Sequence, residues 1–172
     1  MASLMENLVQ ALDEECTMYE KLLGLSSRKT AIIISGDLKA LAEITDEEQC
    51  VIGKIASLDK KREVAMENIA SVLNTDVDSL KLTDLITILE KRPEDQRNLA
   101  VQRDRLVNVA GNVRRVNGQN QELLKSSLEM VKFEMNIIQA AKSAPQTANY
   151  SRTAGTTGDV IGYTSGGFDA KQ

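Results

Sequence analysis

The sequence contains no histidine and no tryptophan, and only two cysteines, three tyrosines and two phenylalanines among its 172 residues. Histidine is the commonest general base and the commonest protein ligand of transition metals, so its absence removes the usual means of both functions. A core with so few aromatic side chains must be aliphatic, which suits helix-on-helix packing better than a β-sandwich. The composition therefore favours an all-α fold and argues against an enzyme.

The motifs of several common active sites are also missing. No GxSxG nucleophile elbow occurs, and Gly155 and Gly158 lack the lysine and the flanking elements of a phosphate-binding loop. The carboxylate pairs Glu14–Glu15 and Glu47–Glu48 lie among charged neighbours, where we expect all four to be ionised and solvated, and no Glu-x-x-His motif of a di-iron bundle accompanies them. We predict no catalytic residue, no metal and no cofactor.

Neither the charge nor the hydropathy pattern indicates nucleic acid or a membrane as a partner. The net charge is −4 and no block of basic residues stands out, which argues against nucleic acid and anionic membranes. No apolar run approaches the roughly 18 residues of a spanning helix, and residues 1–15 lack the basic and apolar regions of a signal peptide. We therefore expect a cytoplasmic protein without direct membrane insertion.

The two cysteines do not suit a disulfide. If two helices meet at a turn near Gly36, Cys16 lies opposite roughly residue 56, and Cys50 is then about six residues, or about 9 Å, out of register. This separation is too large for a disulfide, which is also rare in the cytosol. We expect Cys16 and Cys50 to be free and buried as small apolar side chains.

Apolar residues recur at helical spacing over three long segments of the chain. The expected helices cover residues 3–34, residues 38–73 and residues 93 to about 142. The dipeptide Asn117-Gly118 is a strong signal for a hairpin turn in isolation. The apolar spacing continues unshifted across it, so we expect the third long helix to run through Gly118.

A short helix and a segment of different composition complete the organisation. Apolar positions predict the short helix at residues 83–91, before the proline that opens the last long helix. From residue 143 the chain carries five of its ten glycines and many serines and threonines. The prediction is an elongated antiparallel bundle of three long helices plus one short helix over residues 1–142, followed by a flexible Gly/Ser/Thr-rich tail over residues 143–172.

The second half of the last long helix is apolar on nearly every side. A helix that is apolar on one face needs one neighbour, and a helix that is apolar all round needs two. At about 1.5 Å per residue, this helix is expected to outrun the other two by about ten residues, starting near Met130. An alternative is that the helix tilts so that Phe133 and Ile137 complete an ordinary core. We expect Asn117 and Asn120 to be buried polar residues that fix the register.

Several motifs make the chain similar to the FlgN-type flagellar export chaperones. They are the Gly36-Asp37-Leu38 restart, the short helix around residues 82–89, and Asn117-x-x-Asn120-x-x-Leu123-Leu124-x-x-Ser127-Leu128-x-x-Val131, with a Gly-rich end at residues 167–171. The resemblance covers nearly the whole chain. It implies a cytosolic chaperone of the flagellar type III export system that binds the C-terminal helical ends of the hook-associated (hook–filament junction) proteins. Such a chaperone prevents premature assembly and delivers its substrate to the export gate in the membrane.

The resemblance also implies where the substrate binds, because the last part of the long final helix engages the substrate in related proteins. An amphipathic substrate helix is expected to dock on this segment. Tyr150, an aromatic residue just beyond the helix, is a candidate contact for the export gate. The rival interpretation is a structural coiled-coil protein that self-associates through the same helix as a homodimer. The predicted substrate-binding residues are Leu124, Leu128, Val131, Phe133, Met135 and Ile138.

Overall fold

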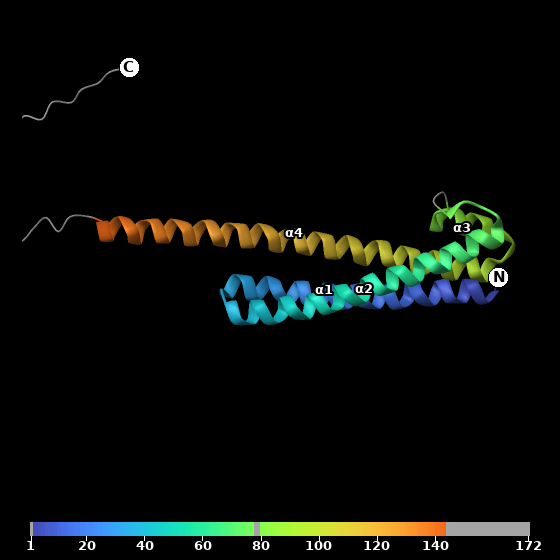
Figure 1. The fold of residues 1–172 in the computed structure, drawn as a ribbon, viewed down its shortest axis with the longest axis horizontal. Coiled ribbons are helices and arrows are strands. Elements are labelled where there is room, and N and C mark those ends of the chain that lie inside the picture. The colour runs from blue at the N-terminus through green and yellow to red at the C-terminus, as the bar shows by residue number, and fades with distance from the viewer. Residues whose placement is uncertain (1, 78–79, 144–172) are drawn as a thin grey trace, which may run out of the picture. The chain divides into compact units, whose positions relative to one another are not determined.

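Helices make up almost all of the part of the chain that the computed structural model describes, residues 2–77 and 80–143 (Figure 1). The predicted all-α class is confirmed, and no strand occurs in these residues. The predicted helix at residues 38–73 has the observed bounds, the first helix is one residue longer at each end, and the last ends one residue later. The predicted short helix at residues 83–91 begins one residue earlier and continues after residue 88 as a 3-10 helix. Gly118 lies inside a continuous helix, as expected. The elements are α1 (Ala2–Ser35), α2 (Leu38–Leu73), α3 (Leu82–Ile88), the 3-10 helix η2 (Leu89–Lys91) and α4 (Pro93–Ser143).

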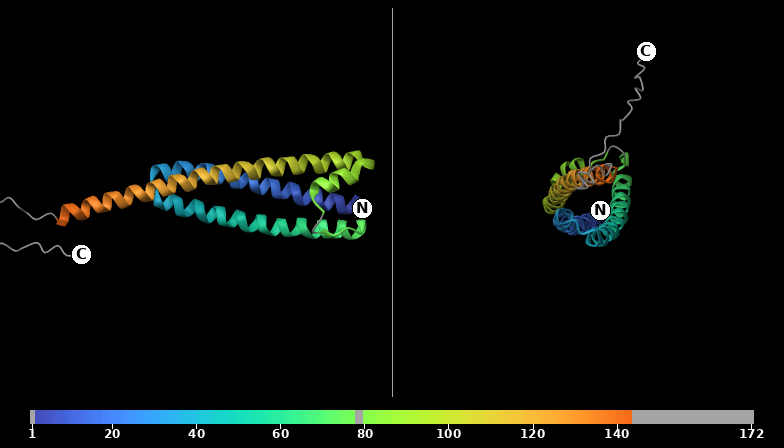
Figure 2. Two further views of the ribbon diagram at one scale, coloured as in Figure 1. Left: turned by 90° about the horizontal axis from the view of Figure 1, so that it is seen from above. Right: turned by 90° about the vertical axis from the view of Figure 1, so that its left-hand side faces the viewer.

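A tight turn at Gly36 reverses the chain between α1 and α2. Gly36 has a φ of 71°, a left-handed conformation that favours glycine, and its N–H donates to the carbonyl of Ile32 at 3.1 Å. Asp37 then caps α2, because its carboxylate accepts from the backbone N–H of Ala40 at 3.0 Å. The two helices consequently lie side by side and antiparallel (Figures 1 and 2).

The first compact unit comprises residues 1–134 and holds two apolar clusters. One lies at the end that carries the N-terminus and α3 (Figure 1), where Leu8 of α1, Ile69 of α2, Leu85 of α3 and Leu99 of α4 are all fully buried. The other lies between the α1–α2 pair and Val113 of α4. Aliphatic side chains predominate in both clusters, as the scarcity of aromatic residues predicted.

The second compact unit begins at Met135. Its described part, residues 135–143, is helical and every side chain in it is exposed. The predicted division between the bundle and the tail at residue 143 stays a prediction, and the tail lies outside the described residues. None of the described helices is long and apolar enough to cross a membrane.

Charged contacts fix how α4 lies along α1. The guanidinium of Arg105 in α4 donates to both carboxylate oxygens of Glu20, at 2.8 and 2.9 Å, and to Asp13 at 2.6 Å. This two-point pairing holds the pKa of Glu20 below its ordinary value and raises the pKa of Arg105. Thr30 and Asn120 meet near the other end of α1, 90 positions apart in the sequence.

Two of the carboxylates expected to be solvated are buried. Glu15 is 3% exposed and pairs with Arg62 of α2 at 3.0 Å, and Arg62 also pairs with Asp59. Burial raises the pKa of Glu15, and Arg62 opposes that effect. Glu48 is 7% exposed. The expectation was wrong for both residues because each has a basic partner on the neighbouring helix, which the sequence alone does not reveal.

Two further expectations about burial, those for Cys50 and Asn117, were wrong. Cys16 is buried as expected, but Cys50 is exposed, and both are free. Leu38 and Ile52 of α2, which keep the apolar spacing, are exposed, and so is Asn117 of α4. The apolar spacing therefore marks the face of a helix without fixing how deep each of its positions lies.

Candidate protein-binding surface on α4

The burial of α4 ends at Asn120. Leu99, Val109, Val113, Val116 and Asn120 are buried, Leu123 and Leu124 are half-buried, and all residues from 125 to 143 are exposed. The offset of 90 positions between Thr30 and Asn120 places Ser35, the last residue of α1, level with residue 125 of α4. Exposure therefore begins where α1 ends.

A layer of buried and half-buried polar groups marks this boundary. The amide of Asn120 donates from Nδ2 to the carbonyl of Ser26 at 2.8 Å and accepts at Oδ1 from the Thr30 hydroxyl at 2.6 Å. The Ser26 hydroxyl donates to Oε1 of Glu48 at 2.9 Å, and the ammonium of Lys29 donates to Oε2 of the same carboxylate at 2.8 Å. The layer connects α4 through α1 to α2, and each buried partner is satisfied.

The prediction that Asn120 is a buried polar residue is confirmed. Its partners Ser26 and Thr30, and Glu48, which accepts from Ser26, were not predicted. A signal for two of them was present. Ser26 lies four positions after Leu22 and seven before Ile33, so it interrupts the apolar spacing of α1, and Thr30 follows one helical turn later. A polar interruption on an apolar stripe is typical of a buried hydrogen-bonded layer.

Beyond this layer, α4 carries two lines of apolar side chains within the first compact unit. The first seam consists of Leu124, Leu128 and Val131, and the second seam consists of Met130 and Phe133. Leu128 and Val131 are 60% and 51% exposed, and Met130 and Phe133 are 65% and 64% exposed. At about 100° per residue, the mean directions of the two seams differ by about 160° around the helix axis.

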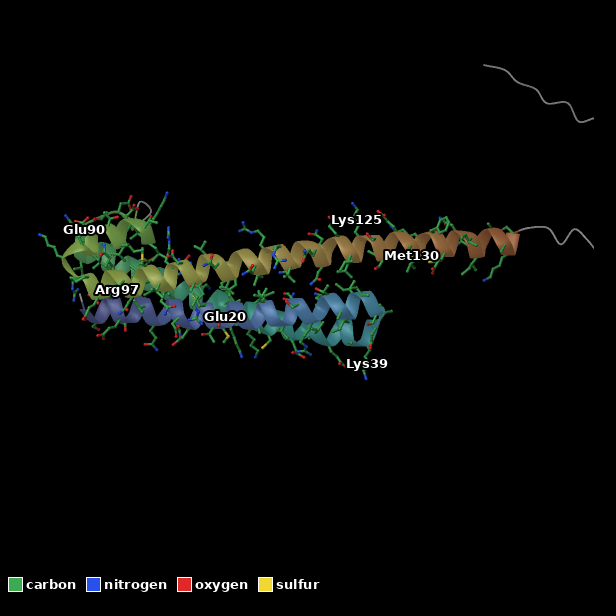
Figure 3. The ribbon with its side chains drawn as sticks, turned by 180° about the vertical axis from the view of Figure 1, so that it is seen from behind. Glu20, Lys39, Glu90, Arg97, Lys125 and Met130 are labelled. Atoms are coloured by element: carbon green, nitrogen blue, oxygen red, sulfur yellow. The ribbon has the colours of Figure 1, made fainter. Side chains whose placement is uncertain are left out.

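Polar residues separate the two seams on both sides of the helix. Lys125, Glu129 and Lys132 share one side, and Ser127 and Glu134 share the other. In Figure 3, Met130 lies further along α4 than Lys125, beyond the turn of the α1–α2 pair near which Lys39 lies. The apolar side chains of this segment are thus open to a partner from two directions.

The predicted substrate-binding residues lie as follows. Leu124 is half-buried, and Leu128, Val131 and Phe133 are exposed in the first compact unit. Met135 and Ile138 are exposed in the second unit. Met135 follows Val131 by four positions and Ile138 follows Met135 by three, which is the spacing of the first seam. Tyr150 lies outside the described residues. The alternative in which Phe133 and Ile137 complete an ordinary core is wrong, because both side chains are exposed.

The extent of the exposed segment also differs from the expectation. It begins at Lys125 and not near Met130. The expectation rested on helix lengths alone, which are 36 residues for α2 and 51 for α4. The contacts between α1 and α4 supply the register that lengths cannot give, and they move the start of the exposed segment about one turn earlier.

The described residues contain no group of three or more histidine, cysteine, aspartate or glutamate side chains that could hold a metal ion. The exposed part of α4 offers a partner apolar side chains of varied shape. They include two methionines, whose unbranched side chains adapt to different partners. Exposed apolar surface of this kind is typical of protein–protein interaction sites. Fold and surface together define the class as a helical protein-binding protein.

The family comparison agrees with this class. A family model described as FlgN protein matches residues 1–158. The chain belongs to the FlgN family, and it is accordingly a chaperone of flagellar type III export, from a family of chaperones and not of enzymes. No match was found among curated proteins or among solved structures.

Proposed function

We propose that this protein binds the C-terminal helical segments of the flagellar hook-associated proteins in the cytoplasm, prevents their premature assembly and delivers them to the export gate in the membrane. The proposed contact surface consists of Leu124, Leu128, Val131, Phe133, Met135 and Ile138 of α4. The observation that carries the proposal is that, after the last buried residue of α4, Asn120, Leu124 is half-buried and the other five apolar side chains are exposed. The choice of hook-associated proteins as the client rests on family membership.

The physical basis of the proposal is the burial of apolar surface. The assembly-prone ends of hook-associated proteins are expected to be amphipathic helices, and each buries its apolar face when it docks on α4. Each apolar side chain that passes from water into such a contact contributes about 1.5–3 kcal/mol at most. Binding energy should concentrate in a few residues, and Phe133 has the largest apolar side chain among them. A client held in this way cannot use the same face to polymerise.

The direct test is binding of the C-terminal segment of a hook-associated protein from the same organism, measured by isothermal titration calorimetry. The wild-type chain should bind, and a double variant with Val131→Asp and Phe133→Asp should lose all measurable binding. Because both side chains are exposed, the variant should keep its helicity by circular dichroism. Unchanged affinity in the double variant would remove this surface from the proposal.

A second candidate function is self-association through the same helix. The spacing of four and three positions between Leu124, Leu128 and Val131 is also the spacing of a coiled-coil seam. A sedimentation series over protein concentration separates the two functions. A tight dimer at every concentration that Val131→Asp dissociates favours self-association, and a monomer that binds the client segment favours the chaperone surface.

Delivery to the export gate requires a contact outside the client surface. We propose Tyr150 for this contact, as an aromatic residue close beyond α4. A Tyr150→Ala variant should bind the client segment with wild-type affinity and export less of the hook-associated protein into the culture medium. Wild-type export by this variant would exclude Tyr150 as the gate contact.

A further inference from the structure

Two lysines lie along one edge of the first seam of α4. Lys125 and Lys132 are about two helical turns or about 10 Å apart, and they point about 85° away from the mean direction of the seam. Both are exposed, and among the ion pairs of residues 2–77 and 80–143 none involves either lysine. Lys125 lies on the side of α4 that faces away from the α1–α2 pair (Figure 3). This lysine edge, Lys125 and Lys132, is therefore free to pair with carboxylates of a partner.

The other polar residues near the first seam do not neutralise the lysine edge by direct contact. Glu129 lies between the two lysines along the chain but about 50° further around the helix, toward the second seam. Within the described part of the chain it pairs with neither of them. On the opposite edge, about 75° from the seam, Ser127 is uncharged and Glu134 is acidic. The first seam is thus basic along one edge only.

A second copy of the chain does not supply the missing carboxylates. In heptad terms the first seam occupies positions a and d, and the lysine edge occupies position e. An antiparallel pair of α4 helices brings the lysine edges of the two copies together, and like charges repel. A parallel pair places Lys132 beside Ser127 of the other copy and Lys125 beside Asn120, and neither of these residues is charged. The charge of the edge therefore favours a different protein as the occupant.

We infer that the first seam binds one amphipathic helix of the client, and that this helix carries carboxylates along one edge of its apolar stripe, about two turns apart, which meet Lys125 and Lys132. The inference rests on the proposed function, because it takes the client from there and adds the chemistry that is recognised. The second seam, with Met130 and Phe133, is not part of it. Charge pairs at the rim of a contact act mainly on the association rate and on the choice of partner, so the lysine edge selects the client and the apolar seam holds it.

The test is a calorimetric titration with the purified C-terminal segment of a hook-associated protein at about 0.1 M salt. A double variant with Lys125→Glu and Lys132→Glu should bind at least tenfold more weakly than the wild type, because two attractions become two repulsions. Since both side chains are exposed, circular dichroism should show unchanged helicity. Lys125→Gln with Lys132→Gln, which adds no repulsion within α4, should weaken binding by a smaller factor of at least threefold.

The matched control is the double variant Arg114→Glu with Arg115→Glu. Both arginines are exposed on the same helix, and the substitutions change the net charge by the same amount. They lie at least about 15 Å from Lys125, beyond the Debye length of about 10 Å at 0.1 M salt. The control should bind as the wild type does. An equal loss in the control would assign the effect to net charge and overturn the inference.

A salt series separates charge from packing. At about 1 M salt the Debye length is about 3 Å, so the affinities of the wild type and the charge-reversed variant should differ by less than about threefold. A difference that stays tenfold at high salt would mean that the lysines act through their aliphatic stems, and the inference would be wrong.

The outcomes also distinguish this inference from the proposed function. An uncharged seam variant, Leu128→Ala with Val131→Ala, is titrated beside the charge variants. If it loses binding while the charge-reversed variant binds as well as the wild type or better, the client has no acidic edge, and the function stands without the inference. If neither variant changes the affinity, both are wrong for the first seam. Sedimentation of the free chain should show a monomer, and a dimer that the seam variant dissociates would identify a second copy as the occupant and overturn the inference.

Discussion

The two halves of α4 differ in what surrounds them and not in the kinds of apolar residue they carry. From Leu99 to Asn120 the helix buries one face of leucine and valine side chains against α1 and α2. From Lys125 onward it keeps an apolar content but no side chain is buried. The enclosed half has one apolar direction, and the exposed half has two. The comparison shows how a helix that binds a partner outside its own chain can be identified: it carries more apolar surface than the other helices of its bundle can cover.

The largest expected effect comes from equal truncations in the two halves. Leu99→Ala in the enclosed half should lower the free energy of unfolding by about 2–5 kcal/mol, because Leu99 is 0% exposed and a cavity remains. Leu128→Ala in the exposed half should change it by less than about 0.5 kcal/mol, and should weaken client binding instead. Urea denaturation of both variants measures the difference. Equal losses of stability would show that Leu128 is packed in the free protein and would break the comparison.

A substitution at Asn120, the boundary between the two halves, should lower the free energy of unfolding by less than Leu99→Ala does. Asn120→Leu removes two hydrogen bonds and leaves the Thr30 hydroxyl and the Ser26 carbonyl only their mutual contact at 3.3 Å, so we expect a cost of about 1–3 kcal/mol. Urea denaturation should show a loss of this size. A double variant that also carries Thr30→Val should recover part of it, since the hydroxyl that lost its hydrogen bond to Asn120 is removed. No recovery in the double variant would mean that the layer acts through packing alone.

A smaller effect is expected on the pH dependence of the free energy of unfolding, through the buried Glu15. Burial raises the pKa of Glu15, so the folded chain binds this proton more tightly than the unfolded chain does. The contribution of Glu15 to the free energy of unfolding should therefore fall as pH rises from the ordinary glutamate pKa through the raised folded value, and be restored as pH falls. Glu15→Gln removes this component. Denaturation midpoints of both proteins across the acidic range give the difference, and parallel pH profiles would contradict the assignment.

The smallest expected effect is a difference in the rate at which the two cysteines are labelled, and it leaves the fold intact. Cys50 is exposed and Cys16 is buried, and burial raises the pKa of the Cys16 thiol. A thiol reagent should therefore label one cysteine per chain rapidly in the native protein and the second only in denaturant. Mass spectrometry of peptides identifies the sites. Rapid native labelling of Cys16 would show that the α1–α4 contact opens readily.

Much of the fold follows from the sequence because helical periodicity is a local property. The bounds of α2, the passage of α4 through Gly118 and the apolar excess around Phe133 were all predicted from residue spacing. The burial of Glu15 and Glu48 was not predictable, since it depends on Arg62 and Lys29 on neighbouring helices. Pairings of this kind require the register between helices, and spacing along one helix does not contain it.

The exposed segment shows the same limit. Its apolar character was predicted, whereas its start at Lys125 depends on how α1 and α4 align, which Arg105 and Asn120 determine through contacts far apart in the sequence. The division into two seams can be read from the spacing of Val131 and Phe133. That α4 extends beyond the other two helices was predicted from helix lengths, and the structure adds that the apolar side chains from Leu128 onward are exposed.

Amide hydrogen exchange of the whole chain, with and without the C-terminal segment of a hook-associated protein, tests the central claim most directly. The account predicts that bound client slows exchange in residues 121–134 of α4 and leaves residues 99–120 unchanged, because that half is already enclosed. Slower exchange confined to the α1–α2 pair, with residues 121–134 exchanging as in the free protein, would contradict it.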